Sequence, residues 1–175
     1  WSGSPASKVG RSKHRFPDEH PPRRSRWVPI YGLTSVALSL QPLAALALAA
    51  VVVLLLIDAT GGNPLLGGLV FAPLGGLVAF AFYMAATWIG VRLLQIGLQP
   101  GVYPVRSLRG WQLWTIERLM DDARTYLFPL YAGQLTPLWL RSLGAKIGKN
   151  VEVSTAVMVP KLTDIREGAF LADDT

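Results

Sequence analysis

Residues 147–175 read IGKNVE-VSTAVM-VPKLTD-IREGAF-LADDT, and their pattern repeats every six positions. Each unit begins with an aliphatic residue, and a small or β-branched residue follows four positions later. The aliphatic positions are Ile147, Val153, Val159, Ile165 and Leu171. The small or β-branched positions are Val151, Val157, Thr163, Ala169 and Thr175. Because a helix repeats about every 3.6 residues and a strand every two, a period of six is typical of neither.

A six-residue period is typical of the parallel β-helix built from hexapeptide repeats. Three units form one triangular coil, in which the aliphatic residue points inward and the small residue fits at a corner. We therefore expect residues 147–175 to form the first coils of such a β-helix. Coils are stable only when they stack, and the last unit is incomplete, so we expect the chain to belong to a longer polypeptide. The alternative is an irregular tail with accidental spacing.

Two uncharged stretches precede the repeats. No Asp, Glu, Lys or Arg occurs in residues 27–57 or in residues 59–91, and a bilayer core of about 30 Å needs roughly 20 apolar residues in a helix. Asp58 and the breaker-rich residues 60–64 separate the two stretches, as in a tight turn. The sequence therefore predicts a two-span transmembrane hairpin over residues 27–99. The alternative is a buried hairpin of a soluble protein.

Basic residues flank this hairpin. Residues 1–26 contain seven Lys or Arg against two acidic residues and few aliphatic ones, so we expect a basic disordered linker. Arg92, Arg106 and Arg109 follow the second stretch. Because basic flanks stay in the cytoplasm, both ends are predicted to be cytoplasmic and the Asp58 turn external. A single aromatic residue, Phe16, lies among the cations of the linker, and this sparse interleaving favours anionic lipid over nucleic acid as its partner.

Small residues in the second stretch suit helix packing. Gly67, Gly68, Gly75 and Gly76 fall on one helical face, where another helix can approach closely, although glycine is also simply common in membrane helices.

The residues that usually bind metals are scarce. The chain has no cysteine, and its two histidines lie in the basic linker without suitably spaced carboxylates. We therefore expect no disulfide and no metal site.

Residues 100–146 are predicted to form amphipathic and capping helices. From residue 111 to residue 127 the apolar residues share one helical face, and a stripe of tryptophans with a cation lies on another. The apolar face consists of Ile116, Leu119, Met120, Ala123 and Leu127. Such a helix either lies in the cytoplasmic membrane interface or covers the open end of the β-helix.

A second helix is expected to begin at Thr136 as N-cap, with Pro137 at the first helical position, and to end before Gly144. Its apolar residues can cover the first coil. These residues are Leu138, Trp139, Leu140 and Leu143. Aromatic and basic residues near the ends of the membrane spans are predicted to lie at the headgroup level. These candidates for the membrane interface are Trp27, Tyr31, Trp88, Trp111, Trp114 and Arg118.

Residues 135–154, LTPLWLRSLGAKIGKNVEVS, with IREGAFLADDT at the end of the chain, resemble hexapeptide-repeat acyltransferases. In that family a capping helix runs through a Leu-Gly-Ala step into the first coils of a left-handed β-helix. The layout from residue 27 to residue 175, most specifically from Pro100 onward, resembles a narrower group. This group is the membrane-embedded C-terminal region of non-ribosomal peptide synthetases of the poly-lysine-synthase type, in which membrane helix pairs alternate with β-helix domains.

This resemblance implies transfer of an aminoacyl group from a carrier thioester to a free amine, which makes a peptide or isopeptide bond. It implies the bacterial cytoplasmic membrane as location. The implied partners are the bilayer, a carrier domain of the same polypeptide, and other helix pairs and β-helix domains, with no nucleic acid. Phosphopantetheine on the carrier domain and ATP at an adenylation domain are implied for the parent, and no cofactor is implied for this segment.

Catalytic residues are not identified by the sequence. Hexapeptide acyltransferases usually take their base from a histidine in a later coil, and no histidine follows His20. Asp173 and Asp174 are candidates for binding a cationic amine, or are solvated turn carboxylates. Two other functions remain open. One is a membrane-bound acetyltransferase that uses acetyl-CoA, and the other is a non-catalytic membrane anchor and assembly module.

Overall fold

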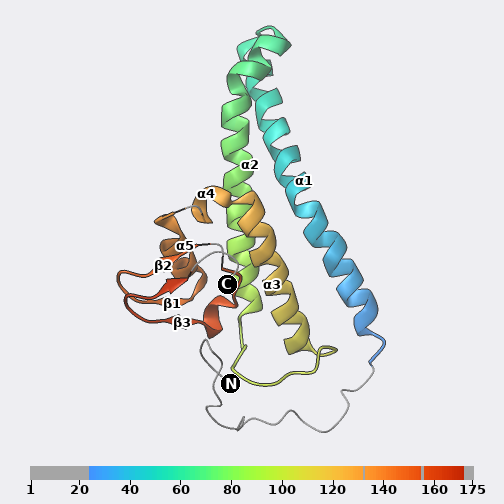
Figure 1. Cartoon of the computed structure of the whole chain (residues 1–175). Helices are drawn as coiled ribbons and strands as arrows, with labels where there is room; N and C mark the ends of the chain where they lie inside the picture. Colours follow the sequence, from blue (N-terminus) through green and yellow to red (C-terminus); the bar gives the residue numbers. More distant parts are fainter. Residues whose placement is uncertain (1–23, 132, 155, 172–175) are drawn as a thin grey trace, which may run out of the picture.

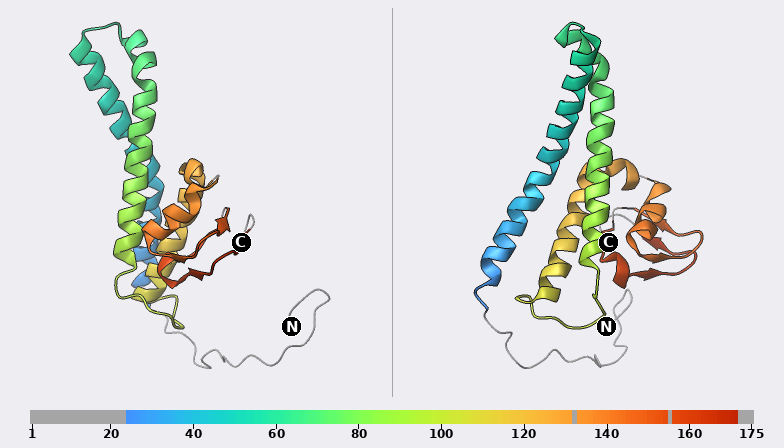
Figure 2. Two further views of the ribbon diagram at one scale, coloured as in Figure 1. Left: turned by 90° about the vertical axis from the view of Figure 1, so that its left-hand side faces the viewer. Right: turned by 180° about the vertical axis from the view of Figure 1, so that it is seen from behind.

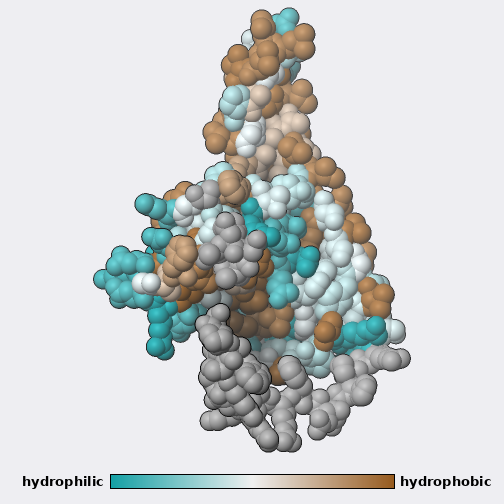
Figure 3. Space-filling model, in the orientation of Figure 1, coloured by the Kyte–Doolittle hydropathy of each residue, from teal (hydrophilic) through white to brown (hydrophobic). Residues whose placement is uncertain are grey.

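The computed structural model describes residues 24–131, 133–154 and 156–171. Its largest feature is a helical hairpin of α1 (Trp27–Thr60) and α2 (Pro64–Leu94), shown in Figure 1. Both helices are long and apolar enough to cross a membrane, and only 11% and 6% of the residues in their most apolar stretches are buried. Because a core helix of a soluble protein would be mostly buried, this exposure indicates membrane association. Apolar residues cover the projecting end of the hairpin in Figure 3.

The turn between the helices is set by its local sequence. Gly61 ends α1 in the left-handed conformation with φ of 59°, which glycine adopts without steric cost. The Asn63 side chain accepts hydrogen bonds from the backbone nitrogens of Leu65 (2.9 Å) and Leu66 (3.4 Å), and Pro64 occupies the first turn of α2. The hairpin therefore turns within the breaker-rich residues that the sequence singles out.

One glycine of each pair on α2 faces α1. A Cβ atom added at Gly67 would lie 2.8 Å from Cγ1 of Ile57, and one added at Gly75 would lie 2.8 Å from Cγ2 of Val53. The neighbouring Gly68 and Gly76 would meet nothing within 4 Å. Gly67 and Gly75 thus allow α1 and α2 to approach closely. This agrees with the first explanation offered for these glycines, the approach of another helix.

Helix α3 (Leu108–Tyr126) packs alongside the hairpin. It begins at Ser107, whose Oγ accepts a hydrogen bond from the backbone nitrogen of Gly110 at 3.1 Å. The five apolar residues predicted to share one face are at most 5% exposed. Figures 1 and 2 show α3 running along the half of the hairpin that is remote from the turn, in contact with both α1 and α2.

Two short helices follow, α4 (Phe128–Tyr131) and α5 (Leu135–Leu143). The prediction that Thr136 caps α5 is wrong, because the helix begins earlier, after Gln134. Thr136 is fully buried, and its hydroxyl donates to the carbonyl oxygens of Leu130 and Gly133 at 3.1 and 3.0 Å. The prediction that Gly144 ends the helix is confirmed by its left-handed conformation.

The apolar residues of α5 are divided between core and surface. Trp139, Leu140 and Leu143 are buried, as expected for a covering helix. Leu138 is 57% exposed, so the expectation that it joins them is wrong. It lies on the opposite face of the helix because one residue corresponds to a rotation of about 100°.

Four short strands form two parallel pairs in the described part of the chain: β1 (Lys146–Ile147) with β3 (Asp164–Ile165), and β2 (Glu152–Val153) with β4 (Phe170–Leu171). In both pairs each residue lies opposite the residue eighteen positions later. The 3₁₀-helix η1 (Pro160–Leu162) lies between β2 and β3. The five aliphatic residues of the hexads belong to the core or pack against it.

These ladders are two residues long and form two separate sheets, so the described residues do not make up a closed β-helix. The structure shows parallel pairing with an aliphatic interior, and the β-helix itself stays a prediction. Residues 1–23, which include the predicted basic linker and both histidines, lie outside the described residues.

The glycine contact between the membrane helices gives a first prediction. Replacing Gly75→Val forces a side chain against Val53 of α1 and should lower the free energy of unfolding by about 1–3 kcal/mol. Thermal unfolding of the purified chain in detergent micelles measures this loss. Gly76→Val is the matched control, because its side chain enters open space. Equal losses for the two variants would contradict the contact.

Candidate functional site

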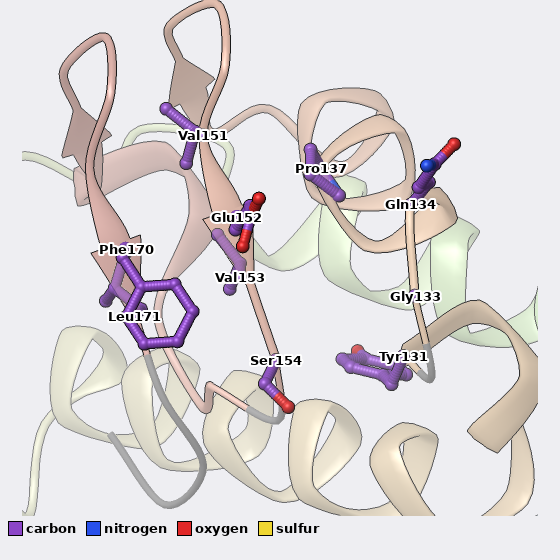
Figure 4. Close-up of a pocket in the computed structure, with 10 residues that line it drawn as sticks. All are labelled: Tyr131, Gly133, Gln134, Pro137, Val151, Glu152, Val153, Ser154, Phe170 and Leu171. Carbon is purple, nitrogen blue, oxygen red and sulfur yellow. The ribbon is translucent and has the colours of Figure 1, made fainter.

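A pocket of about 400 Å³ lies between the α4–α5 segment and the strands β2 and β4. Figure 4 shows it from the side, with Glu152 on β2 between the ring of Phe170 on β4 and helix α5. Its lining residues are Tyr131, Gly133, Gln134, Pro137, Val151, Glu152, Val153, Ser154, Phe170 and Leu171. The pocket therefore lies between the capping helices and the β2–β4 strand pair.

Glu152 gives this pocket its charge, since no other residue that lines it is ionised at neutral pH. Its register partner on β4 is Phe170, whose side chain is 72% exposed. Glu152 is itself exposed, so its carboxylate is accessible to a ligand from solvent. A carboxylate next to aromatic rings is suited to bind a cation such as an alkylammonium group.

Tyr131 forms the inner wall and is 1% exposed. Its hydroxyl oxygen accepts a hydrogen bond from Nε1 of Trp139 at 3.0 Å. Burial raises the pKa of Tyr131 to about 12, with the Trp139 hydrogen bond opposing that rise in part. The phenol therefore stays protonated at neutral pH and does not act as a base.

Within residues 24–131, 133–154 and 156–171 there is no histidine or cysteine, and no group of three metal-binding side chains comes together. The described pocket can bind and orient a cation, and the base for acyl transfer is not identified among these residues. Asp173 and Asp174, predicted to bind an amine, lie outside the described residues. They follow Leu171, which lines the pocket.

Three of the residues predicted at the membrane interface pack together between α1 and α3. The ring centroid of Tyr31 lies 4.8 Å from that of Trp114 and 6.5 Å from that of Trp27. The Tyr31 hydroxyl donates to the carbonyl oxygen of Val105 at 2.6 Å. Trp27, at 8% exposure, is buried by the chain itself. We call these three residues the aromatic cluster.

The three remaining candidates for the membrane interface are two tryptophans that hydrogen-bond to other helices and one exposed arginine. Nε1 of Trp111 donates to Oγ1 of Thr34 at 2.9 Å, which ties α3 to α1. Nε1 of Trp88 donates to the carbonyl oxygen of Ser142 at 3.1 Å, which ties α2 to α5. Arg118 is exposed on α3. Their position at the lipid headgroups stays a prediction.

A lysine connects the strand region to the end of the membrane hairpin. Nζ of Lys161, in η1, donates to the carbonyl oxygen of Gln95 at the C-terminus of α2 at 3.0 Å. A cation is favourable there because the carbonyl groups of the last helical turn carry partial negative charge. The pocket is therefore held in a defined position relative to the hairpin.

Glu152, Tyr131 and Phe170 were not singled out from the sequence. The alternation Val151-Glu152-Val153 predicts that Glu152 points out of the strand, which is correct. Nothing local indicates that α5 and Tyr131 pack beside that strand. The pocket depends on contacts between segments distant in sequence, which a repeat pattern does not encode.

The buried pair of Tyr131 and Trp139 gives a second prediction. Tyr131→Phe leaves Nε1 of Trp139 without its acceptor, and an unsatisfied buried donor should cost about 1–3 kcal/mol of unfolding free energy. A double-mutant cycle with Trp139→Phe, measured by unfolding in detergent, should show coupling between the two residues. Tyr126→Phe, at a side chain that is 51% exposed, is the control and should change stability little. Additive effects of the pair would contradict the coupling.

Comparisons with known proteins give one informative similarity. The chain is 35% identical over 77 residues, or 43% of its length, to a protein of Acinetobacter baumannii named Delta-poly-L-ornithine synthetase. The matched stretch is 6% of that relative, so the chain spans a small part of its length. No family model matches the chain, and no solved structure matches it. The similarity relates this chain to poly-amino-acid synthetases.

Proposed function

We propose that this chain is the membrane-embedded part of a non-ribosomal peptide synthetase that makes a poly-amino acid. The observation that carries the proposal is the similarity to Delta-poly-L-ornithine synthetase. In the proposed reaction the acceptor ammonium group first loses a proton to a base that is not identified among the described residues, and the neutral amine nitrogen then attacks the carbonyl carbon of a carrier-bound aminoacyl thioester. A C–N bond forms, the C–S bond breaks, and the carrier thiol leaves with the proton lost by the amine.

The second part of the proposal is that residues 147–171 begin a left-handed β-helix of hexapeptide repeats. The eighteen-residue separation of the paired strands supports it, because three hexads make one coil. Burial of Val153 on β2 and of Ile165 on β3, both at aliphatic positions of the hexads, supports it as well. Helix α5 then covers the first coil, as terminal elements of repeat arrays do.

The pocket is assigned to the acceptor amine. Ornithine-like and lysine-like acceptors carry an ammonium group at neutral pH, and Glu152 supplies an accessible carboxylate beside the exposed ring of Phe170. Asp173 and Asp174, two and three residues after Leu171, are proposed to contribute further negative charge. The aminoacyl donor comes from a carrier domain whose phosphopantetheine is loaded at an ATP-dependent adenylation domain, and no residue of this chain is assigned to either group.

The proposed location is the bacterial cytoplasmic membrane, with both ends of the chain in the cytoplasm. Seven Lys or Arg in residues 1–26, together with Arg92 in the last turn of α2 and Arg106 after it, support this orientation. The bilayer is then the first partner of the hairpin. Other helix pairs, other β-helix domains and the carrier domain of the same synthetase are the proposed protein partners.

Cysteine labelling in intact cells tests the orientation. The chain has no native cysteine, so Thr60→Cys at the end of α1 and Ser142→Cys at the end of α5 each create a single thiol. An impermeant thiol reagent should modify the thiol at position 60 from outside and should reach position 142 only after the cells are permeabilised. The reverse pattern would overturn the proposed orientation.

Substitution of Glu152 in the full-length synthetase tests the acceptor site. Glu152→Gln should raise the KM for the acceptor amine about two- to fivefold, which corresponds to an exposed ion pair of up to about 1 kcal/mol. Adenylation and carrier loading should stay normal. Glu167→Gln, at an exposed carboxylate outside the pocket, is the matched control and should leave the KM unchanged.

Two outcomes would contradict the assignment. An unchanged KM in Glu152→Gln, and likewise in Asp173→Asn and Asp174→Asn, would exclude these carboxylates as the amine site. Unimpaired polymer formation after deletion of residues 100–175 would show that the segment only anchors the synthetase.

A further inference from the structure

The geometry points to a position of the bilayer much nearer to the hairpin turn than the uncharged stretches of the sequence suggest. Only the distal halves of the hairpin, residues 42–57 of α1 and 64–83 of α2, lie in the hydrocarbon core, and Asp58 and Thr60, at the end of α1, lie beyond it. The proximal halves, residues 27–41 and 84–94, form with α3 a module on the headgroup and water side. This inference rests on the proposed membrane location and deepens it by fixing where the bilayer ends.

Length supports this division. At about 1.5 Å per residue, the distal halves of α1 and α2 are about 24 Å and 30 Å long, close to the thickness of the hydrocarbon core. The whole of α1 has 34 residues and is about 51 Å long at the same rise. Helix α1 is therefore far longer than one crossing requires. Figures 1 and 2 show that the distal halves project beyond every other described helix and strand.

The distribution of polar residues changes at the same level. No polar side chain occurs in residues 42–57 or 64–82, and glycine contacts hold the two helices together there. In the proximal halves, Nε2 of Gln41 donates to Oγ1 of Thr87 at 3.1 Å, and the Thr87 side chain is fully buried. Two further buried polar residues, Gln112 and Thr115, are contributed by α3. The proximal module thus buries polar side chains that hydrogen-bond within it, as a water-soluble domain does, although Nε1 of Trp27 is buried without a partner.

Charges on α3 limit how deeply the chain can enter the bilayer. The ring of Tyr126 at the end of α3 lies 5.1 Å from the ring of Tyr83, so α3 extends along α2 as far as that residue. The last turns of α3 hold Arg124, paired with Asp121 at 3.1 Å and partly exposed. Because exposed charges are strongly disfavoured in hydrocarbon, the hydrocarbon core must begin at Tyr83 and extend from there toward the hairpin turn.

Exposed apolar residues on proximal α1 do not outweigh these charges. Leu33, Val36 and Leu40 are 72%, 57% and 52% exposed and would gain from deeper immersion. The same movement would take Glu117 and Arg118, both exposed on α3, toward the hydrocarbon. Near the centre of a span, the free energy needed to insert one charged side chain is several times the free energy gained by inserting one leucine or valine. The shallower position of the hairpin in the bilayer is therefore favoured.

Depth measurement by spin labelling tests this boundary on the intact chain. Single substitutions are made in the cysteine-free sequence at exposed positions, Val51→Cys and Leu74→Cys in the distal halves and Leu33→Cys and Leu93→Cys in the proximal halves. The labelled chain is reconstituted in vesicles of phosphatidylethanolamine and phosphatidylglycerol. Accessibility to a polar nickel complex should be several-fold higher at positions 33 and 93 than at 51 and 74, with the opposite order for oxygen.

Each other result has a distinct meaning. Low nickel accessibility at all four positions would place the whole hairpin in hydrocarbon and overturn the boundary, while leaving the membrane location intact. High nickel accessibility at all four positions would show that the hairpin does not insert, and would overturn the proposed membrane location together with the boundary. Polymer synthesis is not the readout, so the proposed reaction is judged separately.

Discussion

The second half of α2 is in contact with three other helices at once. It packs against α1, α3 and α5, and its residues Thr87 and Val91 are fully buried between them. Its C-terminus also accepts the Lys161 hydrogen bond from the strand region. One continuous helix therefore runs from the distal end of the hairpin to the strands, and the position of the strands follows from the position of α2.

Two different kinds of packing hold this helix along its length. Apolar side chains gain little by leaving lipid, so the distal half depends on close van der Waals contact at Gly67 and Gly75. The proximal half combines burial of α3 side chains such as Ile116 with hydrogen bonds such as that from Trp111 to Thr34. The change from one kind of packing to the other coincides with the point at which α3 begins to cover the hairpin.

The sequence was informative where structure depends on local chemistry. The uncharged stretches predicted the helical hairpin, and the helical spacing of the apolar residues predicted which face of α3 is buried. Local rules were less successful at the start of α5, where Thr136 turns its hydroxyl to the preceding α4 segment instead of capping the helix. Contacts between distant segments could not be predicted at all. The burial of Trp27 beside Tyr31, and the pocket at Glu152, both require knowing how α1, α3 and α5 pack.

The pocket and the boundary of the membrane are linked through a short piece of chain. Tyr126 lies beside Tyr83, the last residue assigned to the hydrocarbon, and Tyr131 of the pocket follows five residues later in sequence. Five residues span at most about 18 Å even when extended, so Tyr131 lies within that distance of Tyr126, which lies at the boundary. An amine bound at Glu152 would thus be close to the lipid headgroups. Under the proposed function, a carrier domain tethered to the same polypeptide would have to deliver its thioester only to this narrow zone, where its effective concentration would be high.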